Sequence, residues 1–214
     1  MRGREELGRL FEYELEIFSE EFALPFDAIL GKPLTVCLST FGGATRFFNG
    51  IVTHLRRVES GERYLVFRAI LSPRLWLLQK TRDCRIYQQK SVLDVVKEVL
   101  REHAIAFSER LQSADYQPWD YLTQYRESDF AFISRIMERE GIYYSFKHTV
   151  DGHEMVLSDG VGSHDPVPGY ELVPVRPPDT AQTERDHRTG WRIAHQITEA
   201  AREGIIRAAS YQWR

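Results

Sequence analysis

The chain has 214 residues, a length that accommodates one large domain or two small ones. Its 28 basic and 31 acidic residues leave a formal net charge of −3, which argues against a partner held through phosphate backbones, such as nucleic acid. The apolar fraction of 43% and the aromatic fraction of 12% suffice for a packed core and exclude wholesale disorder.

Cysteine content and apolar run length narrow the class of protein further. Cys37 and Cys84 are too few for a disulfide scaffold and lack the CxxC spacing of a zinc knuckle, so a reducing compartment is the simplest interpretation. The longest apolar runs, such as residues 75–78, fall far short of the ~20 residues of a membrane-spanning helix. The charged residues 1–6 lack the apolar segment of a secretory signal, so we expect no export by the usual route.

Alternating polarity predicts antiparallel strands at the start of the chain. Apolar residues alternate with glutamates over 11–17 and with small polar residues over 34–39, and 64–71 is apolar on both faces except at Arg68. A further strand over 45–58 contains Gly50, which is typical of a bulge or a barrel corner. With turns at Gly42-Gly43 and Ser60-Gly61, these strands predict a small antiparallel barrel over about residues 1–80.

A short helical turn and a longer helix follow. Ser72-Pro73 offers an N-cap with proline at the first helical position, leading into residues 74–78. The longer helix is predicted over 92–103, where Ser91 and Asp94 have the spacing of a capping box. Its inward stripe comprises Val92, Val95, Val96, Val99, Leu100 and His103.

A second helix is predicted over about residues 129–140. It begins after Ser128, carries Asp129 at the positive end of its dipole and ends at Gly141, a residue suited to the left-handed C′ position. The residues expected to point inward are Phe130, Ile133, Ile136 and Met137. We also expect Trp76 and Ile133 to occupy core positions, so that truncating either would cost roughly 2 to 5 kcal/mol.

The rest of the chain predicts a hairpin, a connector and two more strands. Residues 142–148 and 153–159 alternate on either side of Asp151-Gly152, a hairpin signal. Five prolines between residues 160 and 179 indicate an extended connector, and residues 191–197 and 205–213 then alternate again. The fold class predicted is therefore α+β and mostly β, with a barrel followed by a module of two helices and a hairpin.

No motif of a known enzyme class emerges from the ionisable residues. Histidines and carboxylates gather at His148, His153, Asp159, His164 and Asp165, but the first two flank a turn and lack the helical spacing of HExxH. We interpret them as solvated hairpin and loop residues. GxSxG, P-loop and GxGxxG patterns are missing, and neighbouring carboxylates such as Glu138 and Glu140 diverge on a helix. We expect no catalytic residue, metal ligand or cofactor.

Residues 120–132 concentrate aromatic side chains, an arginine and carboxylates just before a predicted helix start. They could form a recognition site. The interpretation we favour is structural: a strand whose tyrosine and arginine hold the cap of the second helix through charge-assisted hydrogen bonds.

Within and after this segment the sequence resembles the VgrG proteins, the spike tips of bacterial type VI secretion. The resemblance rests on residues 124–133 (QYRESDFAFI) and 135–144 (RIMEREGIYY). It extends upstream, in the same order, through 8–15 (GRLFEYEL), 48–52 (FNGIV), 73–78 (PRLWLL) and 85–92 (RIYQQKSV). The matching positions expected to be structural are Gly50, Trp76, Gln124, Tyr125, Arg126, Glu127, Ser128, Asp129, Phe130, Gly141, Tyr143 and Tyr144.

The resemblance implies a fold like the tail hub of contractile phages, with an α+β module between two small barrels. It places the first barrel at residues 1–80, the module and its proline-rich connector at 81–178, and the opening strands of an incomplete second barrel at 179–214. Full members continue through the rest of that barrel, an oligonucleotide-binding-like domain and a trimeric needle, so the resemblance identifies a fragment that begins slightly inside the usual N-terminus.

The implied function is mechanical. Family members form a homotrimer that adapts a hexameric tube protein to a puncturing tip, with baseplate components, a spike-tip protein and effectors as further partners. They assemble in the cytoplasm and are then secreted without a signal peptide. Two alternatives remain open: a tail hub of a contractile phage or related injection particle, and, in a different class, a small metal-dependent hydrolase using residues from His148 to His164.

Overall fold

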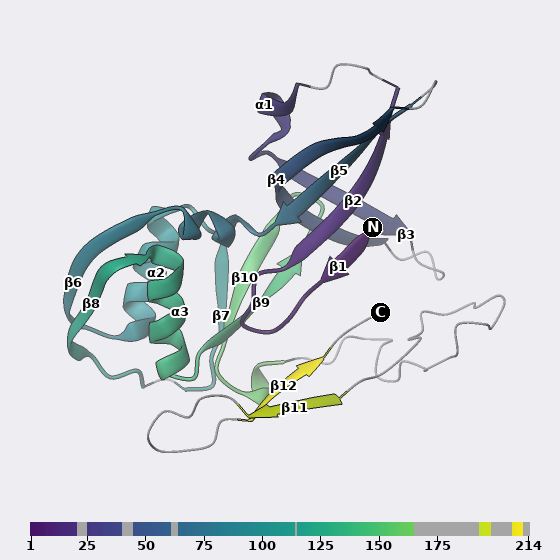
Figure 1. Cartoon of the computed structure of the whole chain (residues 1–214). Helices are drawn as coiled ribbons and strands as arrows, with labels where there is room; N and C mark the ends of the chain where they lie inside the picture. Colours follow the sequence, from purple (N-terminus) through teal and green to yellow (C-terminus); the bar gives the residue numbers. More distant parts are fainter. Residues whose placement is uncertain are drawn as a thin grey trace. The chain divides into compact units, whose positions relative to one another are not determined.

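A computed structural model describes residues 1–20, 25–39, 45–60, 64–113, 115–164, 193–197 and 207–211 (Figure 1). The chain divides into two compact units. The first comprises Met1–Cys37 and Phe47–Asp165, and the second comprises Leu38–Arg46 and Pro166–Arg214. The first unit contains two hydrophobic cores, one under a five-stranded sheet and one around two helices.

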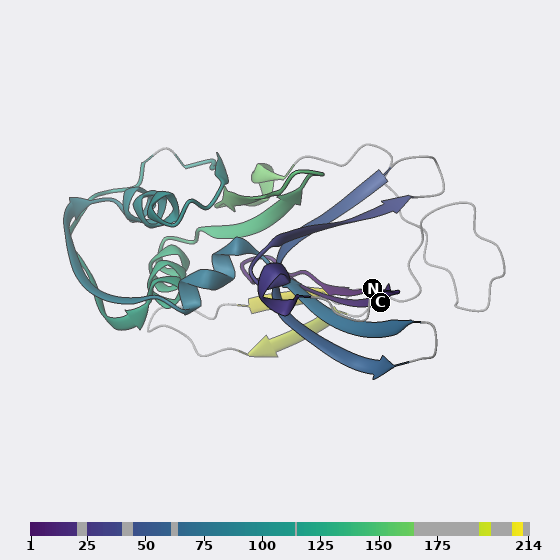
Figure 2. The same cartoon turned by 90° about the horizontal axis from the view of Figure 1, so that it is seen from above.

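The five-stranded sheet has the order β1-β2-β5-β4-β3. Its strands are β1 (Arg2–Arg4), β2 (Glu12–Ser19), β3 (Pro33–Ser39), β4 (Thr45–Ser60) and β5 (Leu65–Ser72). The pairs β1–β2, β2–β5 and β5–β4 are antiparallel, and a four-residue helix, α1 (Phe26–Ile29), precedes β3. The sheet curls into a half-barrel with β1 and β3 at its edges (Figure 2), so the predicted mostly-β, barrel-like start of the chain is confirmed.

The alternating pattern of β2 explains which face of the sheet is buried. Tyr13 and Leu15 lie in the core, while Glu12, Glu14 and Glu16 alternate with them and point outward. On the outer face, Arg68 of β5 forms ion pairs of 3.0 Å with both Glu14 and Glu16. Such exposed ion pairs contribute little stability. Burial of the apolar side chains on the other face of the strands therefore holds this sheet together.

The helical module packs two helices inside a curled two-stranded ribbon. The ribbon is formed by β6 (Arg82–Lys90) and β8 (Trp119–Ser128), antiparallel, and it follows the short 3-10 helix η1 (Arg74–Gln79). It curves around α2 (Val92–Glu102) and α3 (Asp129–Arg139) in both views (Figures 1 and 2). No helix in the described residues is long and apolar enough to cross a membrane.

A three-stranded sheet of order β7-β10-β9 completes the first unit. Its strands are β7 (Phe107–Arg110), β9 (Tyr143–His148) and β10 (His153–Ser158). β9 and β10 form the predicted hairpin, while β7 runs parallel to β10. The short helix η2 (Val161–Ser163) follows β10. β6 and β7 are not predicted by the sequence pattern, because neither segment shows a clean alternation.

Helix boundaries follow local capping chemistry. The hydroxyl of Ser91 accepts a hydrogen bond from the Asp94 amide, and that of Ser128 accepts one from the Ala131 amide, so both predicted N-caps are confirmed. At the end of α3, Gly141 adopts a φ of +71°. The amides of Gly141 and Ile142 donate to the carbonyls of Glu138 and Met137, the pattern of a Schellman motif.

Three details of the predicted helices are wrong. Phe132 is fully buried in the core that α3 shares with α2, whereas Phe130 is only half-buried. Ser72 ends β5 and Pro73 takes the N-cap position of η1, one residue later than expected. Trp76 is half-buried and its ring lies under the Lys80 ammonium at 4.5 Å, so the core positions of η1 are Leu75 and Leu78.

In the second unit, β11 (Ile193–Ile197) and β12 (Arg207–Tyr211) form an antiparallel pair. The two strands predicted there are therefore confirmed. The turns at Gly42-Gly43 and after Ser60 lie outside the described residues, as does most of the proline-rich connector. The domain limits at residues 80 and 178 stay predictions.

Core packing in the helical module yields a stability prediction. Replacing Ile133, which is fully buried, with alanine removes a side chain that the close-packed helices cannot replace. We expect a loss of about 2 to 5 kcal/mol in the free energy of unfolding, measured by urea denaturation. The matched control is Ile86→Ala on the ribbon, where the isoleucine is 63% exposed. Similar losses for both variants would contradict this placement of the core.

Candidate functional site

The most connected polar group of the chain lies where the β9–β10 hairpin meets the five-stranded sheet. His148 and His153 are directly opposed across the hairpin, and their ring centroids are 6.1 Å apart. Both rings face β2 and β4 and are partly buried. The interpretation of these histidines as solvated residues is therefore wrong, because a sequence does not show that a hairpin end docks against a distant sheet.

Asn49 of β4, only 3% exposed, stands at the centre of this histidine junction. Its side-chain oxygen accepts from Nδ1 of His153 at 2.7 Å, and its side-chain nitrogen donates to the Thr35 hydroxyl at 2.7 Å. The Thr35 hydroxyl in turn donates to the carbonyl of Val150 in the hairpin loop. The backbone amide of Asn49 donates to Nδ1 of His148 at 3.1 Å. One buried asparagine thus joins two strands of the sheet to both arms of the hairpin.

Two further contacts extend the junction. The backbone amide of Arg74, at the start of η1, donates to Nε2 of His153 at 2.9 Å. Nε2 of His148 lies 3.0 Å from the hydroxyl of Tyr13, which donates to the carboxylate of Glu5. Burial, together with the nearby His148 and Arg74 charges, lowers the pKa of His153 to about 4, so this imidazole is neutral at neutral pH.

Aromatic rings surround these polar contacts. The ring of Phe11 stacks on Tyr13 at 4.7 Å and meets Phe146 edge-on at 5.0 Å. It also meets the His148 and His153 rings at 4.9 and 5.5 Å. Such ring pairs add roughly 0.5–1.5 kcal/mol each beyond area burial. Phe11 therefore links the core of the sheet to the hairpin.

Gly50 of β4 allows the backbone of this strand to pack closely against Leu71, Ser72 and the ring of Phe11. A Cβ atom at residue 50 would lie 3.0 Å from the Leu71 Cβ and the Ser72 carbonyl oxygen, and 3.2 Å from the ring of Phe11. The position is a site of close packing, and the register shifts of β4 begin two residues later, after Val52.

A second polar cluster holds the corner between β8 and α3. Gln124, 1% exposed, donates to the Asp129 carboxylate at 2.7 Å and to the carbonyl of Glu127 at 3.2 Å. Nε2 of His103, at the end of α2, lies 2.9 Å from the same carboxylate. Burial opposes ionisation of Asp129, but hydrogen bonds from Thr81, Gln124 and His103 outweigh it and lower its pKa.

The side chains expected to hold this corner are not the ones that do so. Tyr125 is 66% exposed, and Arg126 lies over its ring at 5.2 Å, pointing away from the helix cap. Arg126 is the extra residue of a β-bulge opposite Asp83 and Cys84, with a φ of +53°. Arg135 of α3 instead reaches back, donating to Glu127 at 2.5 Å and to the carbonyl of Thr123 at 3.0 Å.

The remaining ionisable residues of the candidate cluster serve other contacts. Asp159 accepts from the amides of Gln112 and Ser113 at 2.7 and 2.8 Å and from the Tyr116 hydroxyl at 2.9 Å. His164 is exposed, stacks on Tyr143 and lies 2.8 Å from its hydroxyl. These contacts fasten the segments on either side of β10, and they do not converge on His148 and His153.

Tyr144, the neighbour of Tyr143, faces the core of the module. It is 2% exposed, and its hydroxyl has no hydrogen-bond partner within the described residues. Burial raises the pKa of this phenol far above its usual range.

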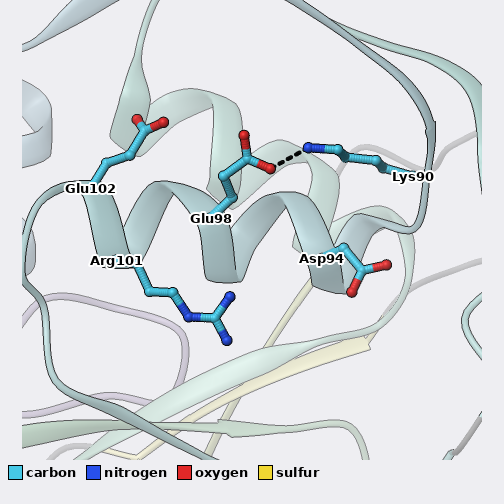
Figure 3. A pocket seen from close by; sticks show the side chains of 5 residues that line it. All are labelled: Lys90, Asp94, Glu98, Arg101 and Glu102. Atoms are coloured by element: carbon cyan, nitrogen blue, oxygen red, sulfur yellow. Dashed lines mark hydrogen bonds and ion pairs between the residues drawn. The ribbon is translucent and has the colours of Figure 1, made fainter.

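No group of three or more histidine, cysteine or acidic side chains within the described residues is arranged to hold a metal ion. A hollow of about 410 Å³ lies along α2, lined by Lys90, Asp94, Glu98, Arg101 and Glu102 (Figure 3). Three of these charges form ion pairs, Lys90 with Glu98 and Glu102 with Arg85. Asp94 accepts a hydrogen bond from the Ser91 hydroxyl, and Arg101 lies over the ring of Phe107. The arrangement is that of a salt-bridged helix face, and the hydrolase alternative finds no support in it.

In the part of the chain that the structure describes, the buried polar groups of both clusters join secondary-structure elements to one another. A sequence profile of the phage tail baseplate hub (GPD) family matches residues 4–204, and the chain belongs to this family.

Among curated proteins, the chain is 45% identical over 197 residues to the type VI secretion system spike proteins VgrG1c and VgrG1a of Pseudomonas aeruginosa. The alignment covers 92% of this chain but only 27% and 31% of those proteins. This chain therefore spans less than a third of the length of these relatives.

Solved structures show the same fold. The Escherichia coli protein c3393, described as a type VI secretion component similar to the T4 phage tail proteins gp27 and gp5, matches with a TM-score of 0.74 at 25% identity. The match covers 91% of this chain and 52% of that one. A tail protein of Neisseria meningitidis matches with a TM-score of 0.58 at 13% identity, over 91% and 54% of the two chains.

The close packing around Gly50 predicts that Gly50→Ala destabilises the chain. The new methyl group would press against Leu71 and the backbone of Ser72, which cannot retreat without disturbing the sheet. We expect a loss of about 1–3 kcal/mol in urea denaturation. Gly152→Ala in the hairpin loop is the control, because no atom lies within 4 Å of its added Cβ. An unchanged midpoint for Gly50→Ala would refute the close approach.

Removing the carboxylate at the β8–α3 corner is predicted to be costly. Asp129→Ala leaves the buried amide of Gln124 and the ring of His103 without their acceptor. We expect a loss of about 2–4 kcal/mol. Asp120→Ala removes an exposed carboxylate that accepts a single bond from Gln89, and it should cost under about 1 kcal/mol. Thermal melts that ranked the two variants equally would contradict a structural role for Asp129.

Proposed function

We propose that this chain is part of the hub of a type VI secretion spike, which adapts a tube to a puncturing tip. The observation that carries the proposal is its 45% identity to VgrG1 spike proteins over 92% of the chain, on a baseplate-hub fold matched over residues 4–204. The proposed work is mechanical: the hub transmits thrust from a contracting sheath without making or breaking a bond. We therefore propose that the chain is not an enzyme.

The internal contacts support a load-bearing role. The histidine junction joins the five-stranded sheet to the hairpin of the helical module, and the Gln124–Asp129–His103 cluster fixes the two helices against the ribbon. Buried hydrogen-bond networks resist shear because their geometry admits few alternatives. A hub that must keep its shape under compression would gain from both. We propose the same structural role for the remaining matched residues, including Trp76, Tyr143 and Tyr144.

The partners follow from the proposed role. We propose a homotrimer in the whole protein, with the curled sheet of residues 1–80 facing the hexameric tube protein and residues 81–178 forming the intervening module. Strands β11 and β12 would begin a second barrel after residue 179. The whole protein would assemble in the cytoplasm, meet baseplate components, a tip protein and effectors, and leave the cell with the spike.

A phage tail hub is the second candidate. The name of the matching family and the likeness to the Neisseria tail protein favour it, although that likeness is at 13% identity and concerns the fold. The much higher identity to spike proteins places the secretion role first.

A chimera tests the proposal. In VgrG1c of P. aeruginosa, the segment that matches this chain is replaced by residues 1–214, and the product is expressed in a strain without its own spike proteins. We expect release of the tube protein into the medium to be restored. The matched control carries Ile133→Asp, which places a charge in the module core and should abolish release. A chimera that accumulates normally yet restores nothing would contradict the spike role and favour the phage hub.

A further inference from the structure

We propose that His153 is an acid-sensitive latch, which holds the end of the β9–β10 hairpin on the sheet at neutral pH and releases it when the imidazole is protonated. The inference stands on the geometry of the histidine junction and does not depend on the proposed function.

The two hydrogen bonds of the His153 ring require the neutral imidazole. Nδ1 donates to the side-chain oxygen of Asn49, whose amide nitrogen is committed to the Thr35 hydroxyl. Nε2 must therefore carry the lone pair, and it accepts from the backbone amide of Arg74. Adding a proton to Nε2 would set two N–H groups against each other at 2.9 Å. Within the described residues, the His153 ring makes these two hydrogen bonds, one to Asn49 and one to Arg74.

His148 differs in a way that singles out His153. Its Nδ1 lies 3.1 Å from both the backbone amide and the backbone carbonyl of Asn49. A proton on Nδ1 of His148 would thus find an acceptor in that carbonyl, and Nε2 already faces the Tyr13 hydroxyl. The nitrogen of His148 that would gain a proton thus has a carbonyl beside it as well as an amide, whereas Nε2 of His153 faces the backbone amide of Arg74.

The charges around the junction reinforce this asymmetry. The charged and titratable groups of the described residues that face the histidines include Arg74 of η1, the phenol of Tyr13 on β2 and, behind it, the Glu5 carboxylate. Glu5 bonds the phenol next to His148, whereas His153 faces Arg74 and the other imidazole. Burial and these two positive neighbours lower the pKa of His153 to about 4.

The consequence is a stability that falls with acid. A released His153 would have a pKa near 6.5, so protons favour the released state as the pH falls from about 6.5 toward 4. Above about pH 6.5 the His153 imidazole is neutral in both states, and its full contribution to the docked state is present. Between pH 7.5 and 5, the equilibrium between docked and released hairpin should shift by about 10- to 30-fold. Release would uncover the ring of Phe11, which packs against both imidazoles.

Amide hydrogen exchange measured by NMR tests the latch directly. The Arg74 amide hydrogen is bonded to His153, so its exchange rate, corrected for the intrinsic pH dependence, reports release. We expect it to accelerate about 10- to 30-fold between pH 7.5 and 5. The Ile142 amide, bonded to the carbonyl of Met137 at the end of α3, should not accelerate.

His153→Gln is the decisive variant, because an amide can donate to Asn49 and accept from Arg74 but does not titrate. Its Arg74 exchange should stay constant with pH. The matched control His54→Gln replaces an exposed histidine of β4 and should behave as the unsubstituted chain.

If His153→Gln does not fold, NMR titration of the His153 ring in the unsubstituted chain gives the answer. Protonation near pH 4 from the Nδ1–H tautomer supports the latch. Titration near 6.5 with unchanged Arg74 exchange would overturn it, as would equal acceleration in His153→Gln.

Discussion

The fold of this chain depends on one buried amide. Asn49 is a polar side chain inside a strand, and burying it without partners would cost several kcal/mol. Every hydrogen bond that offsets this cost leads to another element: β3 through Thr35, the hairpin through His153 and His148. The sheet and the hairpin can therefore meet in one register only, and close packing at Gly50 fixes the same contact sterically.

The helical module also contains a buried polar group, at the corner between β8 and α3. A two-stranded ribbon such as β6–β8 is marginal alone, and it gains stability by curling over two helices. The buried carboxylate of Asp129 sits where β8 turns into α3, and it collects donors from β8 and from the end of α2. Both clusters hold their secondary-structure elements in one register.

Local patterns predicted the local features of this fold and failed at its long-range contacts. The strands near Tyr13 and Ile142, the N-caps at Ser91 and Ser128 and the end of α3 at Gly141 follow from periodicity and capping, which act over a few residues. Asn49 and His148 lie 99 residues apart, and nothing in either segment indicates that they meet. Residues 48–52 carried part of the family resemblance, but no local pattern indicated a physical role for Asn49.

The same distinction explains the error at residues 124–129. The density of polar and aromatic residues drew attention to the corner between β8 and α3, yet alternation in a strand places neighbours on opposite faces. Gln124 shares the inward parity of the buried Leu122, and Tyr125 between strand positions of that parity faces solvent. Arg126 has the inward parity too, but the β-bulge there turns it outward, and Asp129 lies beyond the strand, at the start of α3. A parity count along β8 would have chosen Gln124 correctly and Arg126 wrongly.

The central claim is that the Asn49 network makes the sheet and the helical module one cooperative unit. Hydrogen exchange of β5 and α3 amides over a urea series tests it most directly, because each segment then yields its own opening free energy and urea dependence. We predict equal values in the unsubstituted chain and separate values in Asn49→Ala. Different opening free energies for the two segments in the unsubstituted chain would contradict the account.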